Sequence, residues 1–128
     1  MSPRPTWDEY GLALAQTVAL RADCTRRKVG AVILGPDHRV RGAGYNGAPS
    51  GVPGCASSGA CPRGQSTVAA YSNYDNCIAI HAEANALLHG RHEGGTMYVT
   101  DAPCAGCEKL LRGSGIVRVV WPEGEMSV

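Results

Sequence analysis

The sequence predicts an α/β fold of three layers, an α-β-α sandwich in which helices cover both faces of a central mixed sheet. Two observations predict it. Short apolar runs typical of buried strands alternate with segments of helical periodicity, in the order α-β-β-loop-α-β-α-β. The chain has 128 residues, 44% of them hydrophobic, which is enough to bury the core of one domain but too few for two. We therefore expect residues 1–128 to form a single domain.

The first third of the chain predicts one helix and a pair of strands. Thr6-Trp7-Asp8-Glu9 has the form of a capping box, and apolar residues recur behind it, so a helix is expected over about residues 6–22. The apolar run 29–34 is suited to a buried strand. Gly35-Pro36-Asp37-His38 predicts a turn into a second strand over 39–45, antiparallel to the first.

The remaining elements follow a long segment, 46–75, that is rich in Gly, Pro, Ser and Ala and has no sustained periodicity. A segment of this length inside a domain is usually functional. A helix is expected to begin near 76–80 and to end at about His89, before Gly90. Beyond it the pattern predicts a strand over 96–100, a short helix over 104–111 and a last strand over 116–121.

The composition excludes several classes of protein. A formal net charge of +1 is not the excess of Lys and Arg that a binder of polymeric nucleic acid normally has. No apolar stretch reaches the ~18 to 20 residues of a membrane span, and the polar N-terminus does not resemble a signal peptide. We expect a cytoplasmic protein with no membrane partner. Its six cysteines should then be reduced, and their spacing favours metal ligation, although several could be small buried hydrophobes.

Two short motifs carry chemistry: His81-Ala82-Glu83 and Pro103-Cys104-Ala105-Gly106-Cys107. Cysteines three apart on a helix share a face, so Cys104 and Cys107 can present two thiolates to one ion. His81 would add a nitrogen ligand. Three protein ligands leave the fourth position of a tetrahedral zinc ion open for water, whose pKa the metal lowers to about 7.

Glu83 is placed to move the proton that such chemistry requires. Residues two apart in mid-helix point ~200° away from each other, so His81 and Glu83 can share a site only at the N-terminal end of a helix. Each motif alone is weak evidence, because Cys-x-x-Cys also occurs in redox proteins and zinc ribbons. Together they form the pairing typical of zinc deaminases.

At this point the sequence resembles the cytidine deaminase superfamily, and more closely its deoxycytidylate (dCMP) deaminase branch. The resemblance covers nearly the whole chain, and the segment Gly44-Tyr45-Asn46-Gly47-Ala48-Pro49-Ser50-Gly51 discriminates that branch from generic nucleoside and tRNA deaminases. The other segments that carry it are Cys24-Thr25-Arg26-Arg27-Lys28-Val29-Gly30-Ala31-Val32-Ile33, His81-Ala82-Glu83-Ala84-Asn85-Ala86, Thr96-Met97-Tyr98-Val99-Thr100, and Pro103-Cys104 with Cys107.

The resemblance implies the roles of the site residues. Glu83 is the implied proton shuttle and His81, Cys104 and Cys107 are the implied ligands of a catalytic zinc ion. Asn46 is expected to contact the sugar, and the Ala82 backbone N–H the base carbonyl. The implied reaction is hydrolysis of dCMP to dUMP with release of ammonia. The alternatives are another cytosine nucleoside or a modified cytosine nucleotide as substrate, or a catalytically silent, zinc-stabilised interaction domain.

The resemblance also implies assembly and regulation. Members form homo-oligomers, often hexamers, and many respond to dCTP and dTTP, which are expected to act at Gly44–Gly47. Members usually add a helix and a strand after the position of Trp121, and we expect this extension to be missing here. Some bacterial and viral members carry a second, structural zinc, whose thiolates would here be Cys24, Cys55, Cys61 and Cys77.

The residue that would bind a nucleotide phosphate stays open at this level. Arg26, Arg27 and Lys28 form the densest basic cluster, and Arg63 lies in the long segment. Arginine can hold phosphate oxygens with two parallel hydrogen bonds. The alternative is that this cluster is a solvated helix end whose cations favour the helix dipole.

Overall fold

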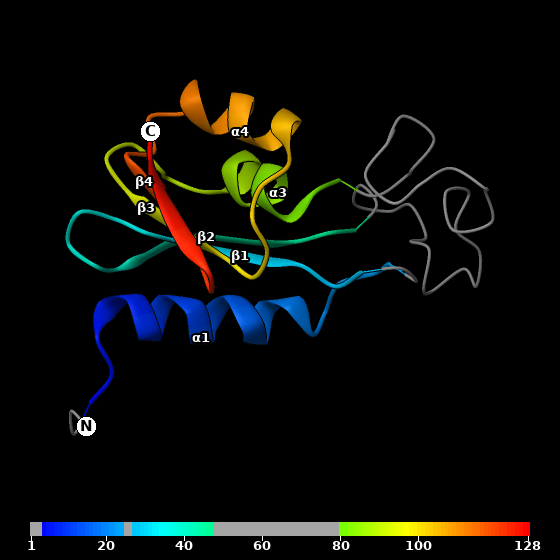
Figure 1. The fold of residues 1–128 in the computed structure, drawn as a ribbon, viewed down its shortest axis with the longest axis horizontal. Coiled ribbons are helices and arrows are strands. Elements are labelled where there is room, and N and C mark those ends of the chain that lie inside the picture. The colour runs from blue at the N-terminus through cyan, green and yellow to red at the C-terminus, as the bar shows by residue number, and fades with distance from the viewer. Residues whose placement is uncertain (1–3, 25–26, 48–79) are drawn as a thin grey trace.

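The computed structural model describes residues 4–24, 27–47 and 80–128, and in them a five-stranded mixed sheet is the central layer (Figure 1). The strand order is β2-β1-β3-β4-β5. Only β3 and β4 pair in parallel, and the other neighbours are antiparallel. The strands are β1 Gly30–Leu34, β2 Val40–Tyr45, β3 Thr96–Val99, β4 Arg118–Trp121 and β5 Gly124–Ser127.

Helices cover the two faces of this sheet, as the three-layer prediction requires. α1 (Trp7–Ala19) lies on one face, and α3 (Ala82–His89) and α4 (Ala105–Arg112) lie on the other (Figure 1). Residues of β1 alternate between the two layers because successive side chains of a strand point to opposite faces. Val32 and Leu34 join the core cluster beneath α1, whereas Ala31 and Ile33 pack with the α3 and α4 side.

Two glycines let helices lie directly on the strands. A Cβ atom at Gly30 would overlap the Ala15 carbonyl oxygen of α1. A Cβ atom at Gly44 of β2 would lie 2.6 Å from the Ala82 carbonyl oxygen of α3. The apolar runs and glycines of these strands therefore bring the helix N-terminus at Ala82 against the sheet.

Three expectations about the elements need correction. α1 begins after Thr6, whose capping box is present, but it ends at Ala19 instead of residue 22. The reason is that Asp23 donates its N–H to the Asn46 carbonyl, 2.9 Å away, which draws the chain toward β2. α3 begins at Ala82, because Ile80 forms an antiparallel bridge with Gly47; residues 76–79 lie outside the described part.

The third correction is β5, a strand that was not expected. It follows Trp121 through a tight turn and pairs antiparallel with β4, Trp121 opposite Gly124. None of the described helices has the length and apolar character to cross a membrane.

Candidate metal centre

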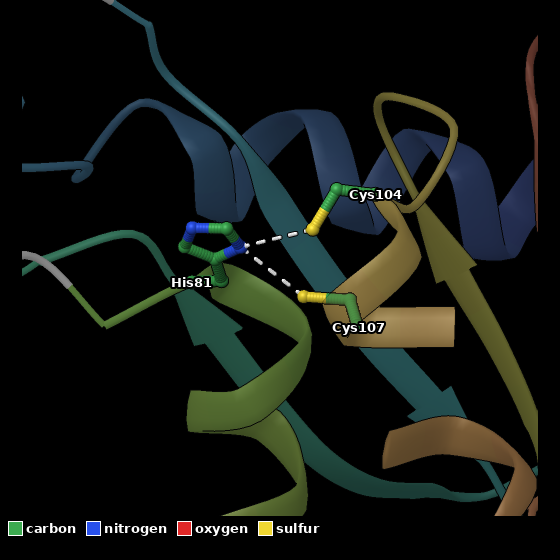
Figure 2. Close-up of side chains that lie close together, drawn as sticks. All are labelled: His81, Cys104 and Cys107. Carbon is green, nitrogen blue, oxygen red and sulfur yellow. Dashed lines mark hydrogen bonds between the residues drawn. The ribbon is translucent and has the colours of Figure 1, made fainter. Parts of the chain in front are cut away.

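His81, Cys104 and Cys107 come together at the N-termini of α3 and α4 (Figure 2). The His81 Nδ1 atom lies 3.2 Å from the Cys107 Sγ atom and 3.6 Å from the Cys104 Sγ atom. Their ligand atoms all lie within 4.8 Å of one another. The expected ligand set is thus assembled from two helices.

The helix caps explain how the three side chains are held. His81 and Cys104 are N-cap residues in extended conformation, so their side chains project beyond the helix ends. Each also starts its helix: the His81 carbonyl accepts from Asn85 N–H at 2.9 Å and the Cys104 carbonyl from Glu108 N–H at 2.8 Å. Cys107 lies in the first turn of α4 and is buried. All three ligands therefore lie at the N-terminal ends of two helices.

The spacing fits a zinc ion. Bonds of about 2.3 Å to sulfur and about 2.0 Å to nitrogen in tetrahedral geometry place a nitrogen and a sulfur ligand about 3.5 Å apart. The two measured nitrogen–sulfur distances, 3.2 and 3.6 Å, lie close to that value. Two thiols and one imidazole are ligands that zinc prefers, and three of them leave a fourth position for water or substrate. His81, Cys104 and Cys107 therefore form a potential catalytic zinc site.

Glu83 lies beside this site and is almost fully buried, with 5% of its surface exposed. Burial raises the pKa of the Glu83 carboxyl, although its own backbone N–H, His81 and the Cys107 thiol act in the opposite direction. The ~200° separation expected within a helix does not apply, because His81 is the N-cap and stands outside the helix. A carboxyl of raised pKa beside a metal site suits proton transfer near neutral pH.

The site places three acidic groups, Glu83, Cys104 and Cys107, close together. Burial raises the pKa of the Cys107 thiol, and the neighbouring Glu83 carboxyl and Cys104 thiol act in the same direction. Without a positive charge nearby, this raised pKa favours the protonated Cys107 thiol. A divalent metal supplies that charge and deprotonates a coordinating thiol.

The segment Gly44–Gly47 connects the elements that carry the site. The Tyr45 carbonyl accepts from the Asn85 side chain of α3 at 2.8 Å. Gly47 exchanges two backbone hydrogen bonds with Ile80, of 2.7 and 3.1 Å, immediately before His81. The segment that was singled out for substrate and effector binding therefore positions the His81 ligand.

Asn46 occupies the middle of that segment and is buried. Its Oδ1 accepts the Val29 N–H and its Nδ2 donates to the Arg27 carbonyl, both at 2.8 Å. The expected contact to the sugar stays a prediction: a carboxamide bonded in this way keeps one further acceptor and one further donor position.

Of the remaining expected residues, Ala82 lies at the site. It is the first residue of α3, 1% exposed, and the N–H groups of a helix's first turn have no acceptor within the helix. Its expected contact to the base carbonyl stays a prediction. Cys24 is described and partly buried, but Cys55, Cys61 and Cys77 lie outside the described residues, so a second zinc stays a prediction too.

Two residues near the site were given no role from the sequence. Asn85 bonds α3 to β2, and Asp101 forms an ion pair with Arg27, with 3.5 Å between Arg27 Nη2 and Asp101 Oδ2. Asp101 stands three residues before Cys104, and Asn85 four after His81. This short distance along the chain from a ligand is the sequence feature that could have indicated that Asn85 and Asp101 lie near the site.

Comparison with known proteins agrees with this geometry. Residues 5–123 match the family model described as the cytidine and deoxycytidylate deaminase zinc-binding region. A deoxycytidylate deaminase of Mycobacterium phage D29 is 52% identical, over 94% of this chain and 97% of the phage protein. A deoxycytidylate deaminase of Schizosaccharomyces pombe is 38% identical, over 92% of this chain but 37% of the yeast protein.

Solved structures show the same fold. The dCMP deaminase of cyanophage S-TIM5 in apo form superposes with a TM-score of 0.69 at 25% identity, over 92% of this chain and 83% of that one. The same enzyme in complex with dCMP and dUMP gives a TM-score of 0.67 at 23% identity, over 94% and 83% of the two chains. The expected fold is confirmed.

Proposed function

The chain belongs to the cytidine and deoxycytidylate deaminase family, and we propose that it hydrolyses dCMP to dUMP with release of ammonia. The observation that carries this function is the buried carboxyl of Glu83 beside three side chains whose spacing suits zinc. A purely structural zinc site has no use for a buried acid at its open side. The family and the geometry thus agree on an enzyme.

In this proposal each residue of the site has one task. Zinc, when bound, supplies the Lewis acid that makes water nucleophilic at neutral pH. His81, Cys104 and Cys107 would hold it. Glu83 takes the proton from the attacking water and gives it to the amine that leaves carbon 4 of the base. The Ala82 N–H donates a hydrogen bond to the base carbonyl, and Asn46 contacts the sugar.

The choice of dCMP as substrate is supported by the relatives. The D29 protein matches this chain over nearly the full length of both and is named for that substrate. The discriminating segment, Gly44–Gly51, is also the feature of the sequence that separates this branch from nucleoside and tRNA deaminases. Deoxycytidine, CMP and base-modified nucleotides are the alternative substrates.

The substrate is tested with a panel of four compounds: dCMP, CMP, deoxycytidine and 5-substituted dCMP. Ammonia release is measured for each with zinc-loaded protein, together with zinc per chain. The expected result is a kcat/KM for dCMP well above that for deoxycytidine. Equal values for the nucleoside and the monophosphate would contradict the proposed substrate while leaving the deaminase chemistry intact.

We also propose that the protein is cytoplasmic and forms a homo-oligomer, a hexamer. In this proposal dCTP and dTTP regulate it by acting at Gly44–Gly47. Exposed large apolar residues among those described are surface that assembly would bury. They include Leu20, Leu88 and Trp7, which are 72%, 64% and 52% exposed. Light scattering coupled to gel filtration tests the mass, and a dCMP assay with added dCTP tests the regulation. A monomer that ignores dCTP would contradict both.

A further inference from the structure

The Asn85 side chain is attached to the outer edge of β2. This strand lies at one edge of the described sheet, with β1 as its neighbour. The Asn46 N–H donates to the Val29 carbonyl, on the β1 side, and the Tyr45–Asn46 peptide is trans. The C=O of a trans peptide points opposite to its N–H, so the Tyr45 carbonyl points away from β1. Asn85 Nδ2 donates to this carbonyl at 2.8 Å and so satisfies an acceptor that β1 cannot reach.

A second attachment lies further along the same edge. Gly47 and Ile80 exchange two backbone hydrogen bonds, of 3.1 and 2.7 Å, directly before His81. Asn85 follows His81 by four residues, and its N–H donates to the His81 carbonyl at 2.9 Å, which closes the first turn of α3. The two attachments therefore lie before and after the turn that carries one metal ligand and the buried carboxyl of Glu83.

The position of α3 depends on such attachments. The helix has eight residues, and an isolated helix of that length is at best marginally stable in water. Packing brings it close to β2, since a Cβ atom at Gly44 would lie 2.8 Å from the Asn85 carbonyl carbon. Packing contacts limit how closely two backbones approach, whereas a hydrogen bond also has a preferred direction. The bond from Asn85 to Tyr45 therefore restrains α3 against sliding along β2.

Sliding of α3 would change the metal centre because the ligands come from two helices. His81 belongs to the start of α3, and Cys104 and Cys107 belong to the start of α4 (Figure 2). A shift of one helix alone changes the separation between the imidazole and the thiols. Residues that orient metal ligands typically contribute 10- to 100-fold to metal affinity or activity, and a misplacement of about 1 Å can cost about 10²-fold in rate.

We propose that Asn85 is a positioning residue of the metal centre, which acts through its hydrogen bond to the Tyr45 carbonyl. The bond sets where the first turn of α3 lies relative to α4, and Asn85 itself contacts neither zinc nor substrate. The catalytic consequence of this inference rests on the proposed deamination of dCMP. Its consequence for the metal is independent of that reaction.

The test compares Asn85→Ala with a control that loses bonds of the same kind elsewhere. Alanine has a higher helix propensity than asparagine, so Asn85→Ala removes the bond to β2 without weakening α3 itself. Ser114→Ala is the matched control. The Ser114 hydroxyl donates to the Leu111 carbonyl and accepts from the Ile116 N–H, beyond the end of α4 that is remote from the ligands. Thermal unfolding of both variants measures what each loses in stability.

Three further measurements report on the metal centre and on turnover. They are zinc affinity by competition with a chromophoric chelator, the visible absorption of cobalt(II)-loaded protein, which depends on ligand geometry, and kcat for dCMP with zinc in excess. Asn85→Ala should lower zinc affinity and kcat about 10- to 100-fold each and should change the cobalt bands. Ser114→Ala should match wild type in all three. Asn85→Gln, which keeps an amide donor on a longer side chain, should recover part of each loss.

A purely structural role for Asn85 gives a different result. Asn85→Ala would then lower Tm as Ser114→Ala does, while zinc affinity and the cobalt spectrum stay at wild-type values, and this outcome would overturn the inference. Asn85→Ser, whose hydroxyl is too short to reach the Tyr45 carbonyl, carries the same test if the alanine variant does not fold. Wild-type protein that turns over no dCMP would contradict the proposed function, and the two metal measurements would still decide the role of Asn85.

Discussion

At the scale of single residues, the central feature is how His81 and Glu83 share one site although they are two positions apart. His81 is the N-cap of α3 and Glu83 is its second helical residue, so the change from extended to helical backbone between them turns both side chains to the same place. In a helix interior, two residues at this spacing could not face the same site. Glu83 is buried in the first turn of α3, where its side chain contacts Cys107.

Cys107→Ser tests the metal centre at this scale. A serine hydroxyl does not ionise at neutral pH, so the site loses one of its two thiolates. We expect the variant to lose one zinc ion per chain after dialysis against a weak chelator, and to lose activity with it. Metal analysis measures the loss.

Lys109→Ser, an exposed position of the same helix, is the control and should keep its zinc. A Cys107→Ser protein that retains as much zinc as this control would contradict the assignment of Cys107 as a ligand.

At the scale of elements, the end of β2 organises the site. Gly44 permits the contact with α3, Tyr45 and Gly47 bond to residues on either side of His81, and Asn46 fixes the start of β1. These contacts are made by backbone groups and by the side chains of Asn46 and Asn85. The position of the zinc ligands therefore depends on a segment that contains no ligand.

Gly44→Ala measures that dependence. The new Cβ would overlap the Ala86 amide nitrogen of α3 and come within 2.6 Å of the Ala82 carbonyl oxygen, and backbone atoms cannot turn aside as a flexible side chain can. We expect a loss of about 1–3 kcal/mol in the free energy of unfolding, the range for overpacking. Zinc affinity should fall as well, because the shift moves the start of α3. Urea unfolding and a zinc competition titration measure the two effects.

Gly106→Ala is the matched control. Nothing lies within 4 Å of a Cβ at this position in α4, and alanine favours a helix over glycine by about 1 kcal/mol, so stability should be unchanged or higher. Equal behaviour of the two variants would contradict the tight contact between β2 and α3.

At the scale of the whole molecule, one ion-pair network joins the α1 layer to the sheet. Arg118 of β4 donates two hydrogen bonds to Asp8 of α1, of 2.9 and 2.7 Å, and a third of 2.6 Å to Glu125 of β5. The Tyr98 hydroxyl of β3 donates to the same carboxylate at 2.8 Å. The network connects the ends of elements that are far apart in sequence.

This network predicts a dependence of stability on pH. The hydrogen bonds from Arg118 hold the pKa of Asp8 below its ordinary value, although burial opposes them and the Tyr98 hydroxyl assists. A lowered folded-state pKa means that the stabilisation is complete above the ordinary aspartate pKa and is lost as pH falls through the folded-state value. Asp8→Asn should therefore cost about 1 kcal/mol near neutral pH, a modest figure because its side chain is 41% exposed, and much less in acid.

Thermal unfolding between neutral and acidic pH measures the difference. Glu123→Gln, an exposed carboxylate in the β4–β5 turn, should follow wild type throughout. A difference between Asp8→Asn and wild type that does not shrink in acid would contradict this account.

Most of the fold could be predicted from sequence because it depends on local patterns. The capping box at Thr6 and the apolar run of β1 act over a few residues, and they were located to within one or two positions. The end of α1 and the start of α3 could not be predicted, since both depend on hydrogen bonds to Asn46 and Gly47 across the sheet. β5 is short and polar, so no periodicity indicated it.

The site also has features that could be predicted from the sequence and features that could not. Its ligands could be predicted because zinc demands particular residue types at particular spacings. The Arg27–Asp101 pair joins residues 74 positions apart, and no spacing rule connects them.

The most direct test of the proposed function is ammonia release from dCMP by zinc-loaded Glu83→Gln protein. Glutamine keeps the size of the side chain but cannot carry the proton, while His81, Cys104 and Cys107 are untouched. We predict that the variant binds as much zinc as wild type and loses at least about 10²-fold in kcat, in keeping with removal of a general acid–base. A fully zinc-loaded variant with the turnover of wild type would contradict the role of Glu83 as the catalytic group.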